Sequence, residues 1–444
     1  MCRAGPWLVC VLVCALCPAS GRTRAAADSV AEIRAEALNR SRVMEWMRAL
    51  TAAPRVTGSP ALDDAARWAE NQLKALGLAN VHLERWPFER RWSVVGMTLE
   101  VVEPETRALA AIPQTWSPGT KGVEAGPLRA VRVTNKGTIA AESMGRMKGA
   151  FALVDGGDSL SADAQNRLQE LLASEGVIAT LERSIGPDAK VVYARTGHTP
   201  EQDGRQLLVP SLAVRQDDFQ RLEQLVKKSS SVVIRGNVSV VDERGDPQAG
   251  LSVIADLVGS NSSLPPVLLG AHLDSMHAAQ GATDNAAGCS ILIEAMRAIA
   301  TANAVTRRTI RIALWGGEEQ GRRGSKAYLQ AHGRELPAAY FNMDRGGGRI
   351  TGMIIEGGDL AGEARRWAQR LFTDGVRTIE SVATAGSDHV TFRAAGVPTF
   401  TFWQDMRSYA STHHSTGDTL AVVRDPDLRQ AAVVVAIAAY LAAQ

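Results

Sequence analysis

The sequence predicts an α/β protein: a layered domain with a mixed, mainly parallel central sheet, interrupted by an inserted second domain. From Leu251 onward, short apolar runs typical of strands alternate with longer runs that have helical periodicity. Between about residues 122 and 245 the pattern changes to short strands with one clear helix. The chain has 444 residues, which is long enough for two domains.

The first residues predict a targeting segment. Arg3 gives a positive start, and the apolar stretch that follows, roughly a dozen residues long, is too short to span a bilayer. Small residues at positions 19–21 complete the layout of a cleaved secretory peptide. We therefore expect residues 1–21 to be removed and the protein to be secreted or periplasmic. An uncleaved anchor and a lipoprotein signal are the alternatives, and Leu16 before Cys17 fits the latter poorly.

The positions of the cysteines leave the exported protein without a disulfide, so its stability must come from burial of the core and, where present, from metals. Four of the five lie in the signal segment, so Cys289 alone remains in the mature chain and no internal disulfide can form. Its apolar neighbours predict a buried structural thiol. The formal net charge of +2, with acids and bases interspersed, argues against a nucleic-acid partner.

The elements follow in order along the chain. Residues 28–77 predict helices because apolar side chains keep helical spacing up to Gly77, and residues 94–102 predict a strand. We expect residues 28–121 and 246–444 to form one domain in two parts, and residues 122–245 to form the insert. Within the insert, residues 150–154, 191–193 and 230–241 predict strands and residues 162–174 a helix.

The C-terminal half supplies the alternating pattern. The run from Ala431 to Ala443 is apolar throughout, but its thirteen residues suit a buried core helix and no membrane span. The expected strands are residues 253–258, 267–272, 309–315, 339–343 and 398–402, and the expected helices are residues 286–300, 325–332, 361–373 and 426–443.

Side chains with metal-binding chemistry gather at strand ends of this half. Six of the eight histidines follow residue 270, and ligand sites in open α/β sheets form where strands end. Each group alone has an ordinary alternative: a hydrogen-bonded strand end for His272 and Asp274, a helix cap for Asp284, a solvated surface pair for Glu318 and Glu319. The remaining groups are Asp344 after a strand and His413 with His414 in a loop.

Taken together, these groups predict a metal centre. His, Asp, Glu, Asp and His follow one another at strand ends or loops of a single domain, with a spare glutamate beside them. Such a set suits a pair of zinc ions that share one carboxylate.

The motifs HLDS, ATDNAAG, LWGGEEQGRRGSKAY, NMDRGG, SDHVTF and HHSTGDTL resemble the co-catalytic zinc aminopeptidase and glutamate carboxypeptidase family. Within it, the chain is most similar to the branch of plasma glutamate carboxypeptidases and their bacterial relatives, and residues 54–59 share in that likeness. The insert resembles a protease-associated domain. The resemblance implies a three-layer α/β/α zinc exopeptidase domain that hydrolyses dipeptides or short peptides with two Zn²⁺ per chain.

The resemblance also implies a role for each residue. One zinc is held by His272 and Asp344, the other by Glu319 and His414. Asp284 bridges the two ions, and Glu318 is the general base that activates the water between them. It further implies a cis peptide bond between Asp284 and Asn285. For the remaining residues we expect His413 to donate a hydrogen bond to the reacting oxyanion, and Asp274 and Asp388 to support the ligands.

Two other functions keep this fold. One is a single-zinc acyl transferase similar to glutaminyl cyclase, and the other is a receptor-like relative without catalysis; the full ligand set favours the peptidase. We expect a short peptide as partner and a free amino terminus on it, because the carboxylates accept an ammonium group. A carboxypeptidase remains an alternative, because four arginines close to the motifs in sequence could bind a substrate carboxylate: Arg322, Arg323, Arg345 and Arg407. The sequence also allows a homodimer.

Overall fold

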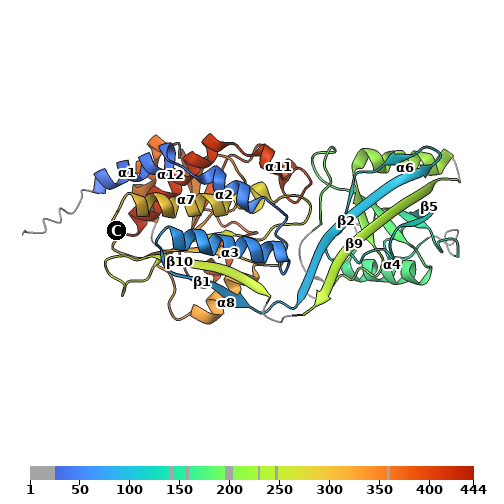
Figure 1. The fold of residues 1–444 in the computed structure, drawn as a ribbon, viewed down its shortest axis with the longest axis horizontal. Coiled ribbons are helices and arrows are strands. Elements are labelled where there is room, and N and C mark those ends of the chain that lie inside the picture. The colour runs from blue at the N-terminus through green and yellow to red at the C-terminus, as the bar shows by residue number, and fades with distance from the viewer. Residues whose placement is uncertain are drawn as a thin grey trace, which may run out of the picture.

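The computed structural model describes residues 26–139, 145–156, 160–195, 204–228, 231–245, 249–357 and 361–444. The expected signal peptide, residues 1–21, lies outside these residues. Two lobes lie side by side along the long axis of the molecule, each built on its own eight-stranded sheet (Figure 1). The C-terminus lies in the first lobe.

The sheet of the first lobe has the strand order β1-β10-β12-β11-β13-β16-β14-β15. The central strands β12, β11, β13 and β16 are parallel, while β1, β10 and β14 each pair antiparallel with a neighbour. The expected mixed, mainly parallel sheet is thereby confirmed. The strands are β1 Ala79–Trp86, β10 Gly250–Leu257, β11 Val267–His272, β12 Ile310–Trp315, β13 Ala339–Asn342, β14 Ile350–Glu356, β15 Thr378–Glu380 and β16 Thr399–Gln404.

Helices cover both faces of this sheet, because successive strand residues point to opposite sides. Val253 and Ala255 of β10 pack into the larger apolar cluster, whereas Ile254 between them packs into the smaller one on the other face. The larger cluster takes in α1 Ala26–Asn39, α2 Val43–Leu50, α3 Pro60–Ala75, α7 Ala287–Thr301, α9 Ala361–Leu371 and α12 Asp425–Ala442, and the smaller one α8 Arg323–His332 and α10 His389–Ala394.

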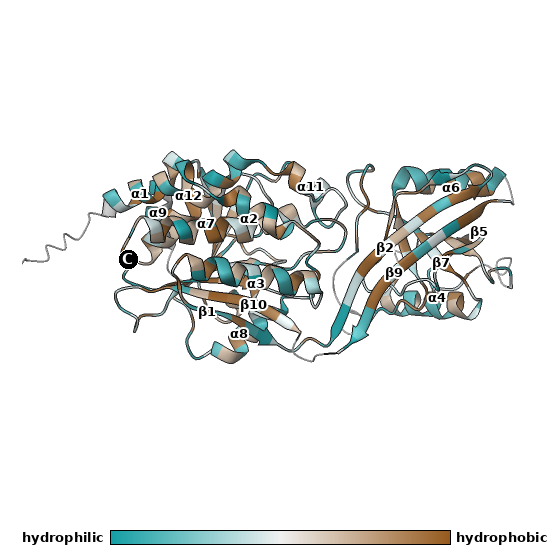
Figure 2. Cartoon of the chain, in the orientation of Figure 1, coloured by the Kyte–Doolittle hydropathy of each residue, from teal (hydrophilic) through white to brown (hydrophobic). Residues whose placement is uncertain are grey.

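The two central helices of the larger cluster are mostly apolar. Figure 2 shows α7 as largely hydrophobic, and its residues 287–299 are all buried. In α12, residues 430–440 are buried as well, which confirms the predicted core helix. No helix in the described ranges combines the length and the apolarity that crossing a bilayer requires.

The second lobe has the strand order β3-β2-β9-β5-β6-β7-β8-β4. Its long antiparallel strands β2 and β9 reach back to the first lobe and connect the two (Figure 1). Helices α4 Ala162–Ser174 and α6 Gln216–Lys228 pack on its sheet. The strands are β2 Arg90–Glu103, β3 Arg107–Ala108, β4 Ala111–Pro113, β5 Glu124–Arg132, β6 Phe151–Asp155, β7 Ala179–Arg183, β8 Ser211–Val214 and β9 Val233–Arg244.

Two expectations about this lobe are corrected. Its sheet already includes β2, β3 and β4, so it begins at Arg90 and not at residue 122. The strand expected at 191–193 is reduced to one bridge, between Tyr193 and Ser415 of the first lobe. In both cases the pairing partner is distant in sequence: β2 pairs with β9 some 140 residues later, a contact that local patterning does not encode.

Candidate metal centre

His272 is the last residue of β11, and its buried imidazole faces two carboxylates. Its Nε2 lies 3.1 Å from Oδ1 of Asp284 and 3.3 Å from Oδ1 of Asp344. Its Nδ1 lies 3.0 Å from the backbone carbonyl oxygen of Asp274, whose carboxylate is farther away at 3.6 Å. The carbonyl of Asp274 thus orients the ring, where the sequence suggested its carboxylate.

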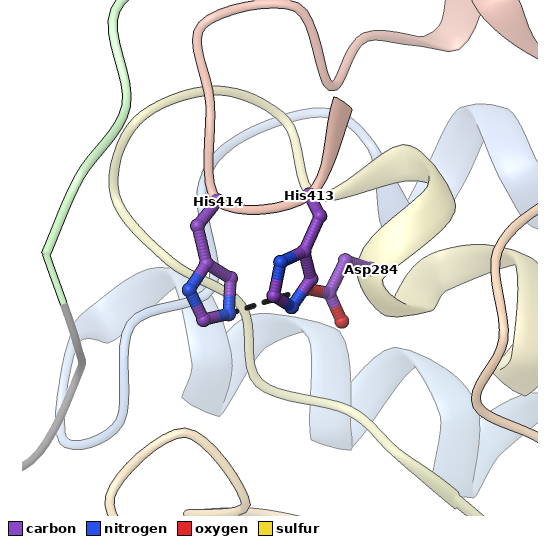
Figure 3. A group of neighbouring side chains, drawn as sticks. All are labelled: Asp284, His413 and His414. Carbon is purple, nitrogen blue, oxygen red and sulfur yellow. Dashed lines mark ion pairs between the residues drawn. The ribbon is translucent and has the colours of Figure 1, made fainter. Parts of the chain in front are cut away.

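Asp284 lies in the kinked turn between β11 and α7, and its two oxygens face different histidines. Oδ1 is directed to His272, while Oδ2 lies 3.4 Å from Nε2 of His414 and 3.6 Å from Nε2 of His413. Figure 3 shows the Asp284 carboxylate beside the stacked imidazoles of His413 and His414, with the ion pair to His414 drawn as a dashed line. The Asp284–Asn285 peptide bond is cis, as predicted.

Glu318 and Glu319 lie in the loop after β12, and one carboxylate holds the backbone of both. The backbone N–H of Glu318 donates to Oδ1 of Asp274 at 3.1 Å, and that of Glu319 donates to Oδ2 at 3.2 Å. Oε2 of Glu319 lies 3.0 Å from Nε2 of His414. The two adjacent glutamates therefore reach the site from a backbone that Asp274 fixes.

His413 and His414 follow α11, Tyr409–Thr412, and their rings stack with centroids 3.8 Å apart. The side chain of His413 is 47% exposed, whereas that of His414 is 23% exposed and contacts both Glu319 and Asp284. His414 is therefore the more buried of the two histidines and the one that contacts two carboxylates.

All seven residues expected to bind metal or to act directly line one cavity of about 600 Å³. They come from the ends of three neighbouring parallel strands, from the kinked turn before α7 and from the loop after α11. Three further residues that the sequence left without a firm role line it too: Arg322, Arg345 and Tyr409.

The electrostatics of the site are those of a crowded acidic cluster. Burial raises the pKa of the Glu318 carboxyl well above its ordinary value, and the nearby carboxylates of Asp388 and Asp344 raise it further. Although burial lowers the pKa of His414, the neighbouring Glu319 carboxylate raises it to about 9. Protonated imidazoles thus supply positive charge at places where a bound cation would supply it instead.

Asp388, which was expected to support the ligands, and its neighbour His389 lie outside the cavity wall. Asp388 is buried, accepts a hydrogen bond from the Ser325 hydroxyl, and has its pKa raised to about 7 by burial. His389 contacts Thr384 at 2.9 Å and faces Glu356 at 3.8 Å, so it belongs to a separate buried polar cluster. Cys289 is buried, and its thiol donates to the carbonyl of His272, which confirms a structural thiol.

The sequence missed the residues that hold the loops in place. The Asp418 carboxylate accepts the backbone N–H groups of Thr283 and Asp284 at 2.6 and 3.1 Å. Thr57 donates its hydroxyl to Asp274, and the buried guanidinium of Arg55 donates to backbone carbonyls of the loop before Asp284. All three residues lie within motifs noted above, but the motifs alone do not show which backbone groups these side chains bind.

Comparison with known proteins agrees with this geometry. Residues 252–439 match the model of peptidase family M28. Carboxypeptidase Q of Mus musculus is 26% identical over 399 residues, which cover 88% of this chain and 83% of that protein. A peptidase M28 precursor from Shewanella amazonensis SB2B has a similar fold, with a TM-score of 0.75, 24% identity, and coverage of 94% and 97%. A zinc aminopeptidase from Bacillus subtilis also has a similar fold, with a TM-score of 0.60 and 20% identity, and the match covers 94% of each chain.

Proposed function

The chain belongs to peptidase family M28 and is a zinc-dependent exopeptidase, and from this premise we propose that it binds two zinc ions and hydrolyses dipeptides or short peptides. The observation that carries the proposal is the position of Asp284. One of its carboxylate oxygens faces His272 and the other faces His414, so the residue stands between two groups of donors.

The donors fit a zinc pair in type and in spacing. Two ligand atoms bound to one tetrahedral zinc lie about 3.3 Å apart, given bond lengths of about 2.0–2.1 Å. The corresponding distances from His272 to Asp284 and Asp344, and from His414 to Glu319, are 3.1, 3.3 and 3.0 Å. Oδ2 of Asp284 and Oε1 of Glu319 are buried without a hydrogen-bond partner, a costly state that a cation would relieve.

Each residue then has a role in binding. We assign His272 and Asp344 to one zinc, Glu319 and His414 to the other, and Asp284 to both. When bound, a zinc pair lowers the pKa of water and polarises the scissile carbonyl. The three carboxylates offset three of the four positive charges, so the centre stays close to neutral.

Glu318 moves the proton. Its carboxylate lines the cavity, accepts a proton from the attacking water and returns it to the leaving amine. Burial raises its pKa, and neighbouring cations bring that pKa back toward the range in which a carboxylate both takes up and releases a proton at neutral pH. The hydrogen bond from its backbone to Asp274 holds it in place. His413, which is half exposed and lines the same cavity, is assigned the hydrogen bond to the reacting oxyanion.

Two arginines bear on the end of the substrate that is recognised. Arg322 and Arg345 line the cavity, and neither forms an ion pair within the described part of the chain. The guanidinium of Arg345 rests on the Trp403 ring, with Cζ 5.4 Å from its centroid, and its buried Nε lacks an acceptor. Both arginines favour a substrate carboxylate, while the acidic cluster favours an ammonium group.

A dipeptide satisfies both preferences, because its two termini lie within one residue of the scissile bond. The cavity of about 600 Å³ has the size of an ordinary small-molecule site. We propose that both free termini contribute to binding, which extends the expectation of a free amino terminus alone. We also propose export through residues 1–21 and a protease-associated type of second lobe that limits the cleft to short substrates.

The test is metal content together with turnover on dipeptides. Purified mature protein is expected to hold close to two zinc ions per chain by elemental analysis and to lose dipeptide cleavage when they are chelated. One ion per chain together with cyclisation of amino-terminal glutamine would establish the acyl transferase instead. Two ions without any peptide cleavage would leave a receptor-like protein.

A further inference from the structure

A short segment of the second lobe, residues 191–194, lies against the loop that carries His414. The backbone N–H of Ala194 donates to the carbonyl of His414 at 2.7 Å, and that of Thr416 donates to the carbonyl of Val192 at 2.9 Å. The N–H of Val192 donates to the Thr416 hydroxyl at 3.0 Å. This segment, which we call the bridging segment, passes beside His414 in Figure 3 as the pale green ribbon.

Tyr193 adds a side-chain link between the lobes. Its hydroxyl donates to the carbonyl of Ala410 at 3.2 Å and accepts the backbone N–H of Asp188 at 3.1 Å. Ala410 lies in α11, directly before the two histidines. The ring packs on Gly186, where any Cβ would lie 2.1 Å from it, so the tyrosine fits closely into its own lobe.

The bridging segment is fixed to the second sheet. The N–H of Tyr193 donates to the Ser184 hydroxyl at 2.8 Å, and the N–H of Ser184 donates to the carbonyl of Val214 at the end of β8. The Thr115 hydroxyl donates to the carbonyl of Arg195 at 3.3 Å. The bridging segment is therefore structurally part of the second lobe.

His414 depends on such support because of its backbone. Its φ of 56° lies in the left-handed region, which is strained for a non-glycine residue and persists only where the surroundings impose it. The bond from Ala194 acts on this same residue. By contrast, the side chains of His272, Glu319 and Asp344 come from the ends of strands in the first sheet.

We propose that the second lobe positions His414, so that the metal position served by Glu319 and His414 depends on both lobes, while the position served by His272 and Asp344 depends on the first lobe alone. The inference rests on the proposed two-zinc function. It makes Tyr193 a positioning residue, and it makes the second lobe a determinant of metal affinity as well as a wall of the cleft.

The experiment is a chelator titration of the full-length zinc-loaded protein with zinc counted per chain. Tyr193→Phe removes the two hydrogen bonds of the tyrosine hydroxyl, to Ala410 and from Asp188. Thr416→Val removes the hydroxyl that accepts the backbone N–H of Val192. Each variant is expected to release one zinc at roughly tenfold lower chelator activity, the size of effect that ligand-supporting groups have, and to keep the other ion at wild-type affinity. Thr416→Ser, which retains the hydroxyl, should restore the wild-type titration.

Tyr328→Phe is the matched control, because it removes a tyrosine hydroxyl that accepts from Arg311 on the far face of the first sheet. If Tyr193→Phe and Thr416→Val titrate as this control does, or if both zinc ions weaken equally, the inference is wrong. Should Tyr193→Phe fail to fold, as judged by circular dichroism, Thr416→Val alone decides. Wild-type protein with a single zinc would contradict the proposed function. In that case the inference holds if Tyr193→Phe lowers the affinity for that zinc and Tyr328→Phe does not, and it is wrong if the two variants behave alike.

Discussion

The carboxylate of Asp274 accepts a hydrogen bond from the backbone N–H of Glu318, with 3.1 Å between Oδ1 and the nitrogen. Its other oxygen accepts the N–H of Glu319, the next residue, at 3.2 Å. One buried side chain thus sets the position of the assigned base and of an assigned ligand together, although it touches neither of their carboxylates.

Asp274→Asn tests this relationship. The amide oxygen can still accept one N–H, but the amide nitrogen then faces the other, so one of the two bonds is lost and a donor is left unpaired. We expect kcat to fall by one to two orders of magnitude and the affinity of one zinc to fall about tenfold. Thr57→Val, which removes only the hydroxyl that also binds Asp274, should have a smaller effect on both quantities.

Glu318→Gln separates catalysis from metal binding. The substitution removes a proton acceptor and no assigned ligand, so turnover should fall by at least about 10³-fold while the zinc content stays at the wild-type value. Elemental analysis and dipeptide cleavage on the same preparation give both readouts. Loss of zinc in this variant would show that the roles of Glu318 and Glu319 are exchanged.

Glu319→Ala and His414→Ala should behave in the opposite way. Each removes a donor that lies 3.0 Å from the other, so each should lower the affinity of one zinc by at least about tenfold. His413→Ala is the neighbouring control, since its side chain is more exposed and is assigned no zinc. A greater zinc loss in His413→Ala than in His414→Ala would reverse the assignment of the ligand.

The two ends of the substrate can be tested separately. A dipeptide, its N-acetyl form and its C-terminal amide should show the highest kcat/KM for the unmodified dipeptide and a loss for each blocked form. Arg345→Gln should reduce the preference for the free carboxylate over the amide by about tenfold or more, because charged hydrogen bonds contribute about 1.5–3 kcal/mol.

Arg407→Gln is the matched control for this experiment, because Arg407 is 89% exposed and pairs with Asp405 outside the cavity. If acetylation is tolerated and amidation stops cleavage, the enzyme anchors the carboxyl end only. If amidation is tolerated by the wild type, the arginines do not bind the substrate carboxylate.

His277 predicts an acid-dependent loss of stability. Its Nε2 lies 2.8 Å from the carbonyl oxygen of Pro113 in the second lobe, and burial lowers its pKa to about 4. In the unfolded chain the imidazole takes up a proton below about pH 6.5, whereas the folded protein resists it until about pH 4. The free energy of unfolding should therefore decrease as the pH falls through this window, by up to about 3 kcal/mol.

Urea unfolding at pH 7.5 and 5.0 measures the effect, in chelated protein so that proton competition for zinc does not contribute. His277→Gln keeps a donor for Pro113 without a titrating group, and its stability should change less between the two pH values. An equal change in the variant and the wild type would assign the acid sensitivity to other residues.

The sequence by itself determined many of the elements and the chemical types at their ends. Residues 267–272 and 162–174 form a strand and a helix with the bounds that were predicted, because periodicity and turn residues are local properties. His272, Glu319 and Asp344 follow strands that proved to be parallel neighbours in one sheet, so their meeting could be expected from the rule that sites in such sheets form where strands end.

Only the tertiary structure decided which side chains face each other. Asp284 stands between His272 and His414, which are 142 residues apart, because the loop after α11 folds back over the kinked turn before α7. The pairing of β2 with β9, and the contact of Ala194 with His414, likewise join segments that are distant in sequence. Such contacts depend on the packing of whole elements, and no periodicity within one segment specifies its distant partner.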